Sequence, residues 1–186
     1  LTGVRIPVTA YIGATPWASF RIDLAGDELR MTGQPEDVPP LARVTLPGLS
    51  QRGYRVYPLV DHLADKIIAT IQRHGPMRKP STRYKDLVDL VAIVTAASVA
   101  ADEQIRALIS EAERREVSLP ASFDIPNRAL WESGYAAEAR RSLLKTALVL
   151  DEALAVVRPF VDPLFDGSAR GIWEPVAGRW VQPNVE

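Results

Sequence analysis

The stretch from residue 57 to 94 constrains the fold most, because it carries two helical patterns in direct succession. In the first pattern, apolar residues recur at the i, i+3, i+4, i+7 spacing of one helical face. These residues are Val60, Leu63, Ala64, Ile67, Ile68 and Ile71. The second pattern runs from about Tyr84 to Val99 and is apolar nearly all round, which is typical of a helix inside a core. Two packed helices are therefore expected at the centre of the domain.

The polar positions of the first helix separate by charge. At about 100° per residue, Asp61 and Asp65 fall on one flank of the apolar stripe. The other flank carries His62, Lys66 and Arg73. A solvated surface, with an acid near the N-terminus that favours the helix dipole, is enough to explain any single one of these charges.

A basic turn joins the two helices and has no acid before Asp86; its basic residues are Arg73, His74, Arg78, Lys79, Arg83 and Lys85. Such a cluster raises the local concentration of a phosphate-bearing ligand, although a solvated loop has the same composition. Ser81 and Thr82 are expected to cap the second helix.

Asp86 and Asp89 lie on one side of the second helix, within its first two turns. Charged groups on a buried helix need partners. Two interpretations stay open. The acids favour the helix dipole while Lys85 pairs with Asp89 one turn on, or a carboxylate orients a basic group that lines a cleft.

The first part of the chain predicts a small sheet. Residues 18–24 alternate strictly, so Asp23 is expected on the uncovered face of a strand with Arg21 as its partner. Pro7 indicates an edge strand over residues 3–12. A loop is expected at 25–41, followed by short strands at 42–46 and 53–58.

Helices are expected after the central pair. Residues 101–117 form an amphipathic pattern with Ile105, Leu108, Ile109 and Ala112 inward, and residues 127–160 form a long pattern that an interruption at Gly134 could divide. Its seam of Leu143, Ala147, Leu150, Leu154, Val157 and Val161 predicts packing in a bundle. Pro159 and Pro163 are expected to end this helix, and Trp173 and Trp180 to anchor an irregular tail.

Composition excludes several classes of site and protein. The chain has 186 residues, of which 47% are hydrophobic, which is enough for one domain or two compact subdomains. The net charge of −1 leaves nucleic-acid affinity to local patches. The absence of cysteine excludes disulfides, thiolate zinc sites and cysteine nucleophiles, and two histidines are too few for a histidine-rich metal site.

Residues 1–58 are expected to form a sheet portion and residues 59–186 a helical portion. The chain shows no signal peptide, no apolar run of about 18 residues, no P-loop and no dinucleotide-binding fingerprint. A cytoplasmic location is therefore expected. Because Leu1 is not a methionine and leads directly into a strand pattern, an N-terminal portion is expected to be missing.

Four segments together resemble the AbiEii/AbiGii-type nucleotidyltransferase toxins: FRIDL at 20–24, YPLVDHLADKI at 57–67, STRYKDLVDL at 81–90 and FVDPLFDGSARGIWEPVAGRW at 160–180. These toxins, which include the MenT type, are polymerase-β-like nucleotidyltransferases of abortive-infection and type IV toxin–antitoxin systems. The resemblance implies an α+β fold in which a small mixed β-sheet precedes a C-terminal helical bundle.

The resemblance also implies residue roles. Lys66 matches the family lysine that reaches nucleotide phosphates, and Asp86 matches the later family aspartate, with Asp89 as second candidate. Asp23 corresponds to a third carboxylate beside the metal-binding pair, and so to a metal ligand.

Further candidates lie around these residues. Arg78, Arg83 and Lys85 are expected to bind phosphate together with Lys66, and Asp61 is a secondary candidate.

The chain departs from the family pattern at its first motif. A Gly-Gly or Gly-Ser turn followed by a magnesium-binding Asp-x-Asp is absent, and no Asp-x-Asp occurs in the sequence. Without that pair a two-metal mechanism cannot be assembled. Either the motif lies upstream of Leu1, which the strand pattern at the start favours, or the chain is a degenerate member.

The expected function is transfer of a nucleoside monophosphate from an NTP to RNA, at the 3′ end of a tRNA, with Mg²⁺ as cofactor and a cognate antitoxin as partner. The alternative is a non-catalytic interaction module that binds a partner protein or RNA on a degenerate nucleotidyltransferase fold. An RNA-cleaving toxin is disfavoured, because neither His62 nor His74 stands in an evident catalytic arrangement.

Overall fold

The computed structural model describes residues 3–25, 31–42, 45, 47–48 and 50–182. The chain divides into two compact units, Leu1–Met31 and Thr32–Glu186. No described helix is long and apolar enough to cross a membrane.

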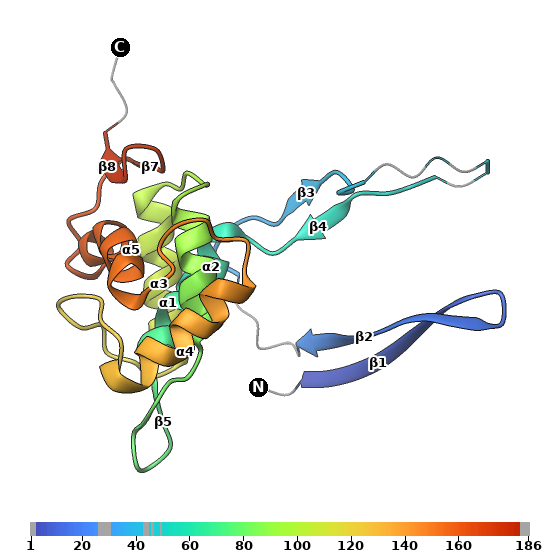
Figure 1. Ribbon diagram of the computed structural model, residues 1–186. Helices are drawn as coiled ribbons and strands as arrows, with labels where there is room; N and C mark the ends of the chain where they lie inside the picture. The colour runs from blue at the N-terminus through green and yellow to red at the C-terminus, as the bar shows by residue number, and fades with distance from the viewer. Residues whose placement is uncertain (1–2, 26–30, 43–44, 46, 49, 183–186) are drawn as a thin grey trace. The chain divides into compact units, whose positions relative to one another are not determined.

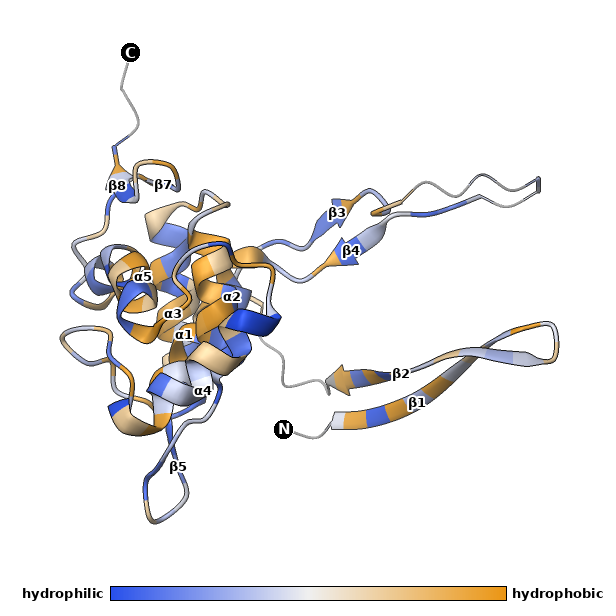
Figure 2. Cartoon of the chain, in the orientation of Figure 1, coloured by the Kyte–Doolittle hydropathy of each residue, from blue (hydrophilic) through white to orange (hydrophobic). Residues whose placement is uncertain are grey.

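The first unit is an antiparallel hairpin of β1 (Gly3–Ile12) and β2 (Thr15–Ala25). Its register pairs apolar residues on one face, including Val8 with Phe20, and places Arg5 opposite Asp23 on the other. The alternation is visible along β1 in Figure 2. Both strands were predicted from the period-two pattern, which the structure confirms.

The second unit contains the helices of the described chain (Figure 1). They are α1 (Leu59–Ile71), α2 (Tyr84–Val94), α3 (Ala101–Arg114), α4 (Arg128–Arg141) and α5 (Leu150–Phe165). Three short antiparallel pairs accompany them: β3 (Glu36–Val38) with β4 (Tyr54–Val56), β5 (Arg73–His74) with β6 (Lys79–Pro80), and β7 (Ile172–Glu174) with β8 (Arg179–Val181).

Helix α2 lies at the centre of this unit and packs against α1, α4 and α5, while α3 packs on α1. Figure 2 shows that hydrophobic residues dominate α2, as expected of a buried helix. The apolar stripe of α1 is buried as predicted, with Ile67 and Ile68 fully covered. The two helical patterns at 57–94 are therefore confirmed as the core of the domain.

Trp131 of α4 fixes the start of α2. Its side chain is fully buried, its Nε1 donates to the Ser81 carbonyl at 2.8 Å, and its ring meets Tyr84 edge-on at 5.1 Å between centroids. Gly134 makes this packing possible, because a Cβ there would lie 2.4 Å from the Tyr84 ring. The start of α2 is thus positioned by a helix about 50 residues away in sequence.

Trp173 closes the other end of α2. Its Nε1 donates to the Val94 carbonyl at 2.7 Å, and its backbone N–H donates to the Val99 carbonyl at 2.9 Å. Trp180 packs on Phe160, with ring centroids 5.1 Å apart. Both tryptophans are the anchors that the sequence predicted, but the tail is not irregular, because β7 and β8 form a hairpin there.

The α+β class is confirmed, with two corrections to the arrangement of strands. The described strands form four separate antiparallel pairs instead of one mixed sheet. The 25–41 segment, expected to be a loop, contains β3. The polymerase-β-like topology and the boundary between 58 and 59 stay predictions, and the strand expected at 42–46 falls largely outside the described residues.

The helix ends were predicted less well. Helix α2 stops at Val94 rather than Val99, where the Thr95 hydroxyl donates to the Val91 carbonyl at 2.8 Å. Residues 127–160 are two helices separated at 142–149, not at Gly134.

Pro159 and Pro163 do not end the last helix but lie inside α5. Each lacks the N–H that would bond to the carbonyl four residues earlier. Those carbonyls belong to Ala155 and Pro159, which are both exposed residues.

Two predicted core positions are exposed. Leu143 is 92% exposed and Ile109 is 47% exposed, while the other seam residues of α5 are buried. In α3 the position that turns inward is Gln104, which is fully buried and donates to the Val60 carbonyl at 3.0 Å. The spacing of apolar residues could not predict this core position, because the residue there is polar.

Candidate functional site

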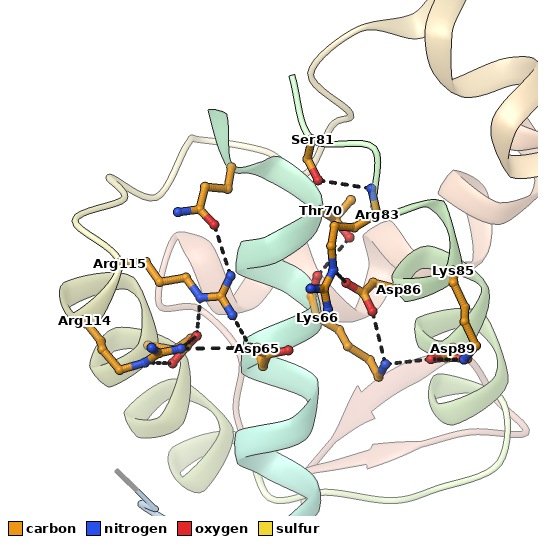
Figure 3. A network of polar contacts seen from close by, with 12 residues as sticks. Asp65, Lys66, Thr70, Ser81, Arg83, Lys85, Asp86, Asp89, Arg114 and Arg115 are labelled. Atoms are coloured by element: carbon orange, nitrogen blue, oxygen red, sulfur yellow. Dashed lines mark hydrogen bonds and ion pairs between the residues drawn. The ribbon is translucent and has the colours of Figure 1, made fainter. Parts of the chain in front are cut away.

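Lys66 of α1 meets two aspartates of α2 (Figure 3). Its Nζ donates to Asp86 Oδ1 at 3.3 Å and to Asp89 Oδ2 at 2.6 Å. The side chains of Lys66 and Asp86 are only 8% and 7% exposed, and that of Asp89 is 27% exposed. The fold therefore brings together three residues that the sequence singled out separately.

Two further cations flank this group. Arg83 Nε donates to Asp86 Oδ2 at 2.5 Å, and Lys85 Nζ donates to Asp89 Oδ2 at 2.8 Å. The result is a Lys66 network of three cations and two carboxylates, with one positive charge in excess. Arg83 and Lys85 are 54% and 72% exposed, so the excess charge faces solvent.

The network depends on how α2 begins. Arg83 is the residue before the helix, and no side chain caps its first turn, so the predicted capping role of Ser81 and Thr82 is wrong. The Ser81 hydroxyl instead accepts from the Arg83 backbone N–H at 3.3 Å. Helical spacing then puts Asp86 and Asp89 on the side of α2 that faces Lys66.

The contacts within the network shift the pKa of Arg83 and of Asp89. The hydrogen bond with Asp86 raises the pKa of Arg83. Burial alone would raise the pKa of Asp89, but the hydrogen bonds from Lys66 and Lys85 outweigh it and lower that pKa. Burial, followed by the charge of Lys66, lowers the pKa of His62, so this histidine is neutral at neutral pH.

A pH titration tests the Asp89 contacts. A carboxyl group whose pKa is lower in the folded state stabilises the protein above its unfolded pKa of about 3.9, and this stabilisation is lost as the pH falls through the folded pKa. We expect the wild type to lose more unfolding free energy than Asp89→Asn as the pH falls below about 4, measured by urea denaturation. Glu103→Gln, an exposed substitution on α3, controls for the loss of one carboxylate. Parallel curves for wild type and Asp89→Asn would contradict the expectation.

The acidic flank of α1 has structural contacts. Asp65 pairs with Arg115, the residue after α3, which also pairs with Glu111 and donates to Gln72 Oε1 at 3.0 Å. Figure 3 shows this group and the Lys66 network on either side of α1. Together the two groups join α1 to α2 and to α3.

Asp61 is buried rather than solvated. It accepts from the Thr32 backbone N–H at 3.0 Å, the Thr32 hydroxyl at 2.6 Å and the Gly33 N–H at 2.9 Å. These bonds hold the chain at residues 32–33 against the start of α1, which is a structural role.

Asp23 belongs to the hairpin unit. It accepts from Arg5 Nε at 2.6 Å and Nη2 at 3.1 Å, so the predicted pairing with Arg21 is wrong. The hydrogen bond from Arg5 lowers the pKa of Asp23, whose side chain is 67% exposed. Its role as a metal ligand stays a prediction.

The described residues do not fit a magnesium ion at the Lys66 network. Three cations already bind Asp86 and Asp89, whereas Mg²⁺ needs carboxylate oxygens that are free to coordinate it. Across the described ranges, no group of three or more histidine, aspartate or glutamate residues could hold a metal.

A pocket of about 630 Å³ adjoins the network. Helix α2 lines it with Lys85, Val88, Asp89 and Ala92, and the end of α4 and the segment up to Thr146 form the opposite wall. This volume is within the range of small-molecule sites, about 300–1,000 Å³. This pocket could not be predicted from the sequence, because residues 142–146 were expected to be helical.

The comparison with family models returns one description, "Nucleotidyl transferase AbiEii toxin, Type IV TA system", over residues 2–157. The chain belongs to the AbiEii family. The matched range contains every candidate site residue, including Asp23, Lys66 and Asp86. No curated protein and no solved structure matches the chain.

Membership of the AbiEii family confirms the resemblance carried by the sequence motifs. The family consists of nucleotidyltransferase toxins of type IV toxin–antitoxin systems, which implies an NTP substrate and an antitoxin partner. Within this family context, the Lys66 network is the strongest candidate site of the described chain, since it joins the lysine and the aspartate that the resemblance had named.

Proposed function

We propose that the chain transfers a nucleoside monophosphate from an NTP to RNA, at the 3′ end of a tRNA. It acts in the cytoplasm as a toxin held in check by an antitoxin. The observation that supports this proposal is the contact between Lys66 and Asp86, two motif residues on different helices, at 3.3 Å. Family membership supplies the reaction class, and the contact supplies a site for it.

The Lys66 network suits a triphosphate because it holds its cations in place before the ligand arrives. The Lys66 ammonium has three N–H donors, of which two bind Asp86 and Asp89, leaving one for a phosphate oxygen. Arg83 and Lys85 add exposed donors beside it. Asp86 orients Lys66 and Arg83, so its role is positioning rather than chemistry.

In the proposed reaction, the hydroxyl oxygen of the RNA attacks the α-phosphorus of the NTP. The new P–O bond forms as the bond to the β-phosphate breaks, so pyrophosphate leaves and the hydroxyl proton passes to solvent. Fixed cations stabilise the negative charge that develops on the phosphate oxygens. Magnesium, which the family resemblance implies, would add charge stabilisation to the triphosphate when bound.

We also propose that the nucleoside part of the NTP binds in the pocket next to the network. Val88 and Ala92 give this pocket an apolar wall suited to a base, and Lys85 belongs both to the pocket and to the network. A nucleotide bound there would direct its phosphates towards Lys66.

A transfer assay tests the proposal. The full-length gene product, freed of antitoxin, is incubated with each labelled NTP, magnesium and tRNA, and label on the RNA is measured. Lys66→Ala is expected to lower the transfer rate at least about 100-fold, the loss typical of one electrostatic donor to a transition state. Arg140→Ala, an exposed cation of α4 outside the network, should transfer at the wild-type rate.

The outcomes separate the hypotheses. Wild-type transfer by Lys66→Ala would remove Lys66 from the mechanism. If the intact protein transfers none of the four nucleotides to RNA, the proposal fails and the non-catalytic interaction module becomes the better description. One observation favours that second candidate: both carboxylates of the network are engaged by cations.

A further inference from the structure

The basic residues of α1, of the start of α2 and of the segment that joins them fall into two groups in the structure. Lys66, Arg83 and Lys85 all pair with Asp86 or Asp89. By contrast, Arg73, Arg78 and Lys79 form no ion pair with any acid in the described part of the chain, and all three are exposed. The second group lies on the hairpin of β5 and β6, so three unpaired cations gather on one small element.

The hairpin has a defined geometry. Ser81 N–H donates to the Gln72 carbonyl at 3.1 Å and closes its base, and Arg78 N–H donates to the Gly75 carbonyl at 3.0 Å and closes its turn. Arg73 Nη2 donates to the Pro126 carbonyl at 2.6 Å, which ties the hairpin to the segment before α4. Figure 1 shows the hairpin extending away from the helices of its unit. Its cations are therefore presented on an ordered support.

The backbone is strained beside these cations. Arg78 has φ 46° and Glu116 has φ 54°, in the left-handed region that is unfavourable for a residue with a side chain. Both residues line one polar cavity of about 420 Å³, together with Arg73. Strained residues collect at functional sites, where the surrounding structure enforces them.

The charge balance of this cavity favours an anion. It is also lined by Arg115, which pairs with Asp65 and Glu111, and by Asp124, which pairs with Arg158 at 3.2 Å. Because Arg115 and Asp124 are paired within the fold, the remaining charged residues that line the cavity are Arg73, Arg78 and Glu116. The neighbouring Lys79 adds a further positive charge.

We propose that the β5–β6 hairpin binds the phosphodiester backbone of the acceptor RNA, at a surface separate from the Lys66 network. The identity of the ligand as RNA rests on the proposed function. The hairpin carries its cations at several positions, which suits the phosphates that repeat along an RNA chain. The cations of the Lys66 network are instead gathered around two aspartates. The hairpin carries no Phe, Tyr or Trp, and His74 is its one aromatic ring. Phosphate contacts from its cations carry affinity rather than sequence preference.

Salt dependence of binding measures this surface directly. The full-length protein is titrated with fluorescent tRNA, without NTP or magnesium, over a range of KCl concentrations. Each phosphate contact contributes about 0.7 to 0.9 to the slope of log Kd against log salt, so Arg78→Gln/Lys79→Gln should reduce that slope by about 1.4 to 1.8. The charge-retaining Arg78→Lys/Lys79→Arg should keep the wild-type slope.

A matched control removes the same charge elsewhere. Arg140 and Arg179 are exposed, and neither pairs with an acid in the described ranges, so Arg140→Gln/Arg179→Gln should leave the slope unchanged. An unchanged slope in the hairpin variant, an equal fall in both glutamine variants, or no binding of RNA by the wild type would overturn the inference. The binding experiment measures no transfer, so a failure of the proposed reaction does not change its result. A failure of the hairpin to bind RNA likewise does not decide whether the transfer occurs.

Discussion

Replacing Asp86 with alanine is expected to lower the free energy of unfolding by about 3 kcal/mol, the low end of the range for breaking a buried ion pair. Asp86 is 7% exposed and is the ion-pair partner of the Arg83 guanidinium in the described chain, while Lys66 would keep Asp89. The substitution therefore leaves a nearly buried ammonium with half of its partners. Removing one member of a buried pair costs more than the pair contributes, because the remaining charge loses its compensation.

Urea denaturation of wild type, Asp86→Ala and Asp102→Ala measures the effect. Asp102 forms an exposed pair with Arg106 at 3.2 Å, and exposed pairs contribute at most about 1 kcal/mol. A loss in Asp86→Ala no greater than in Asp102→Ala would show that the Lys66 network is not a buried charge cluster in solution. A folded Asp86→Asn variant keeps the shape of the side chain but not its charge. Its transfer rate therefore tests whether the charge of Asp86 positions Lys66 and Arg83.

Trp131→Ala is expected to lower the free energy of unfolding by about 3–5 kcal/mol, as large aromatic truncations in a core do. The side chain is fully buried, and its loss also leaves the Ser81 carbonyl without its donor. Because Trp131 packs on Tyr84, the start of α2 and the Lys66 network should loosen with it. The substitution therefore tests whether α4 positions the candidate site.

Calorimetry gives the stability change, and Trp17→Ala is the control, because Trp17 is 71% exposed. Trp131→Phe keeps the aromatic volume in part but not the hydrogen bond, so it should fall between wild type and Trp131→Ala. A loss of less than about 1 kcal/mol in Trp131→Ala would contradict the packing described for α4.

The sequence predicted α1 and α2 well because their apolar spacing reflects burial directly. It failed at 142–149, where Leu143 and Ala147 continue the periodic seam through a break in the helix. Ala147 has φ 56°, and its carbonyl accepts from the Tyr135 hydroxyl at 2.6 Å. That contact is tertiary, so no pattern of local spacing could reveal it.

The same distinction applies to the site. Helical spacing put Asp86 and Asp89 on one side of α2, and the family resemblance added Lys66, so the network could be assembled from sequence. The partners of Asp61 could not, since Thr32 and Gly33 are 29 and 28 residues away along the chain. Asp23 was assigned to its neighbour on the same strand because only the hairpin register reveals Arg5 opposite it.

Trp173 bears on how a domain of this family is delimited. The family match ends at residue 157, in the middle of α5, whereas the indole that covers the carbonyl end of α2 comes 16 residues later. An expression fragment trimmed to the matched range would cut the last helix and discard this cover. A domain boundary taken from the family match alone is too short for this chain, and a fragment that keeps the packing of α2 and α5 has to extend to β8.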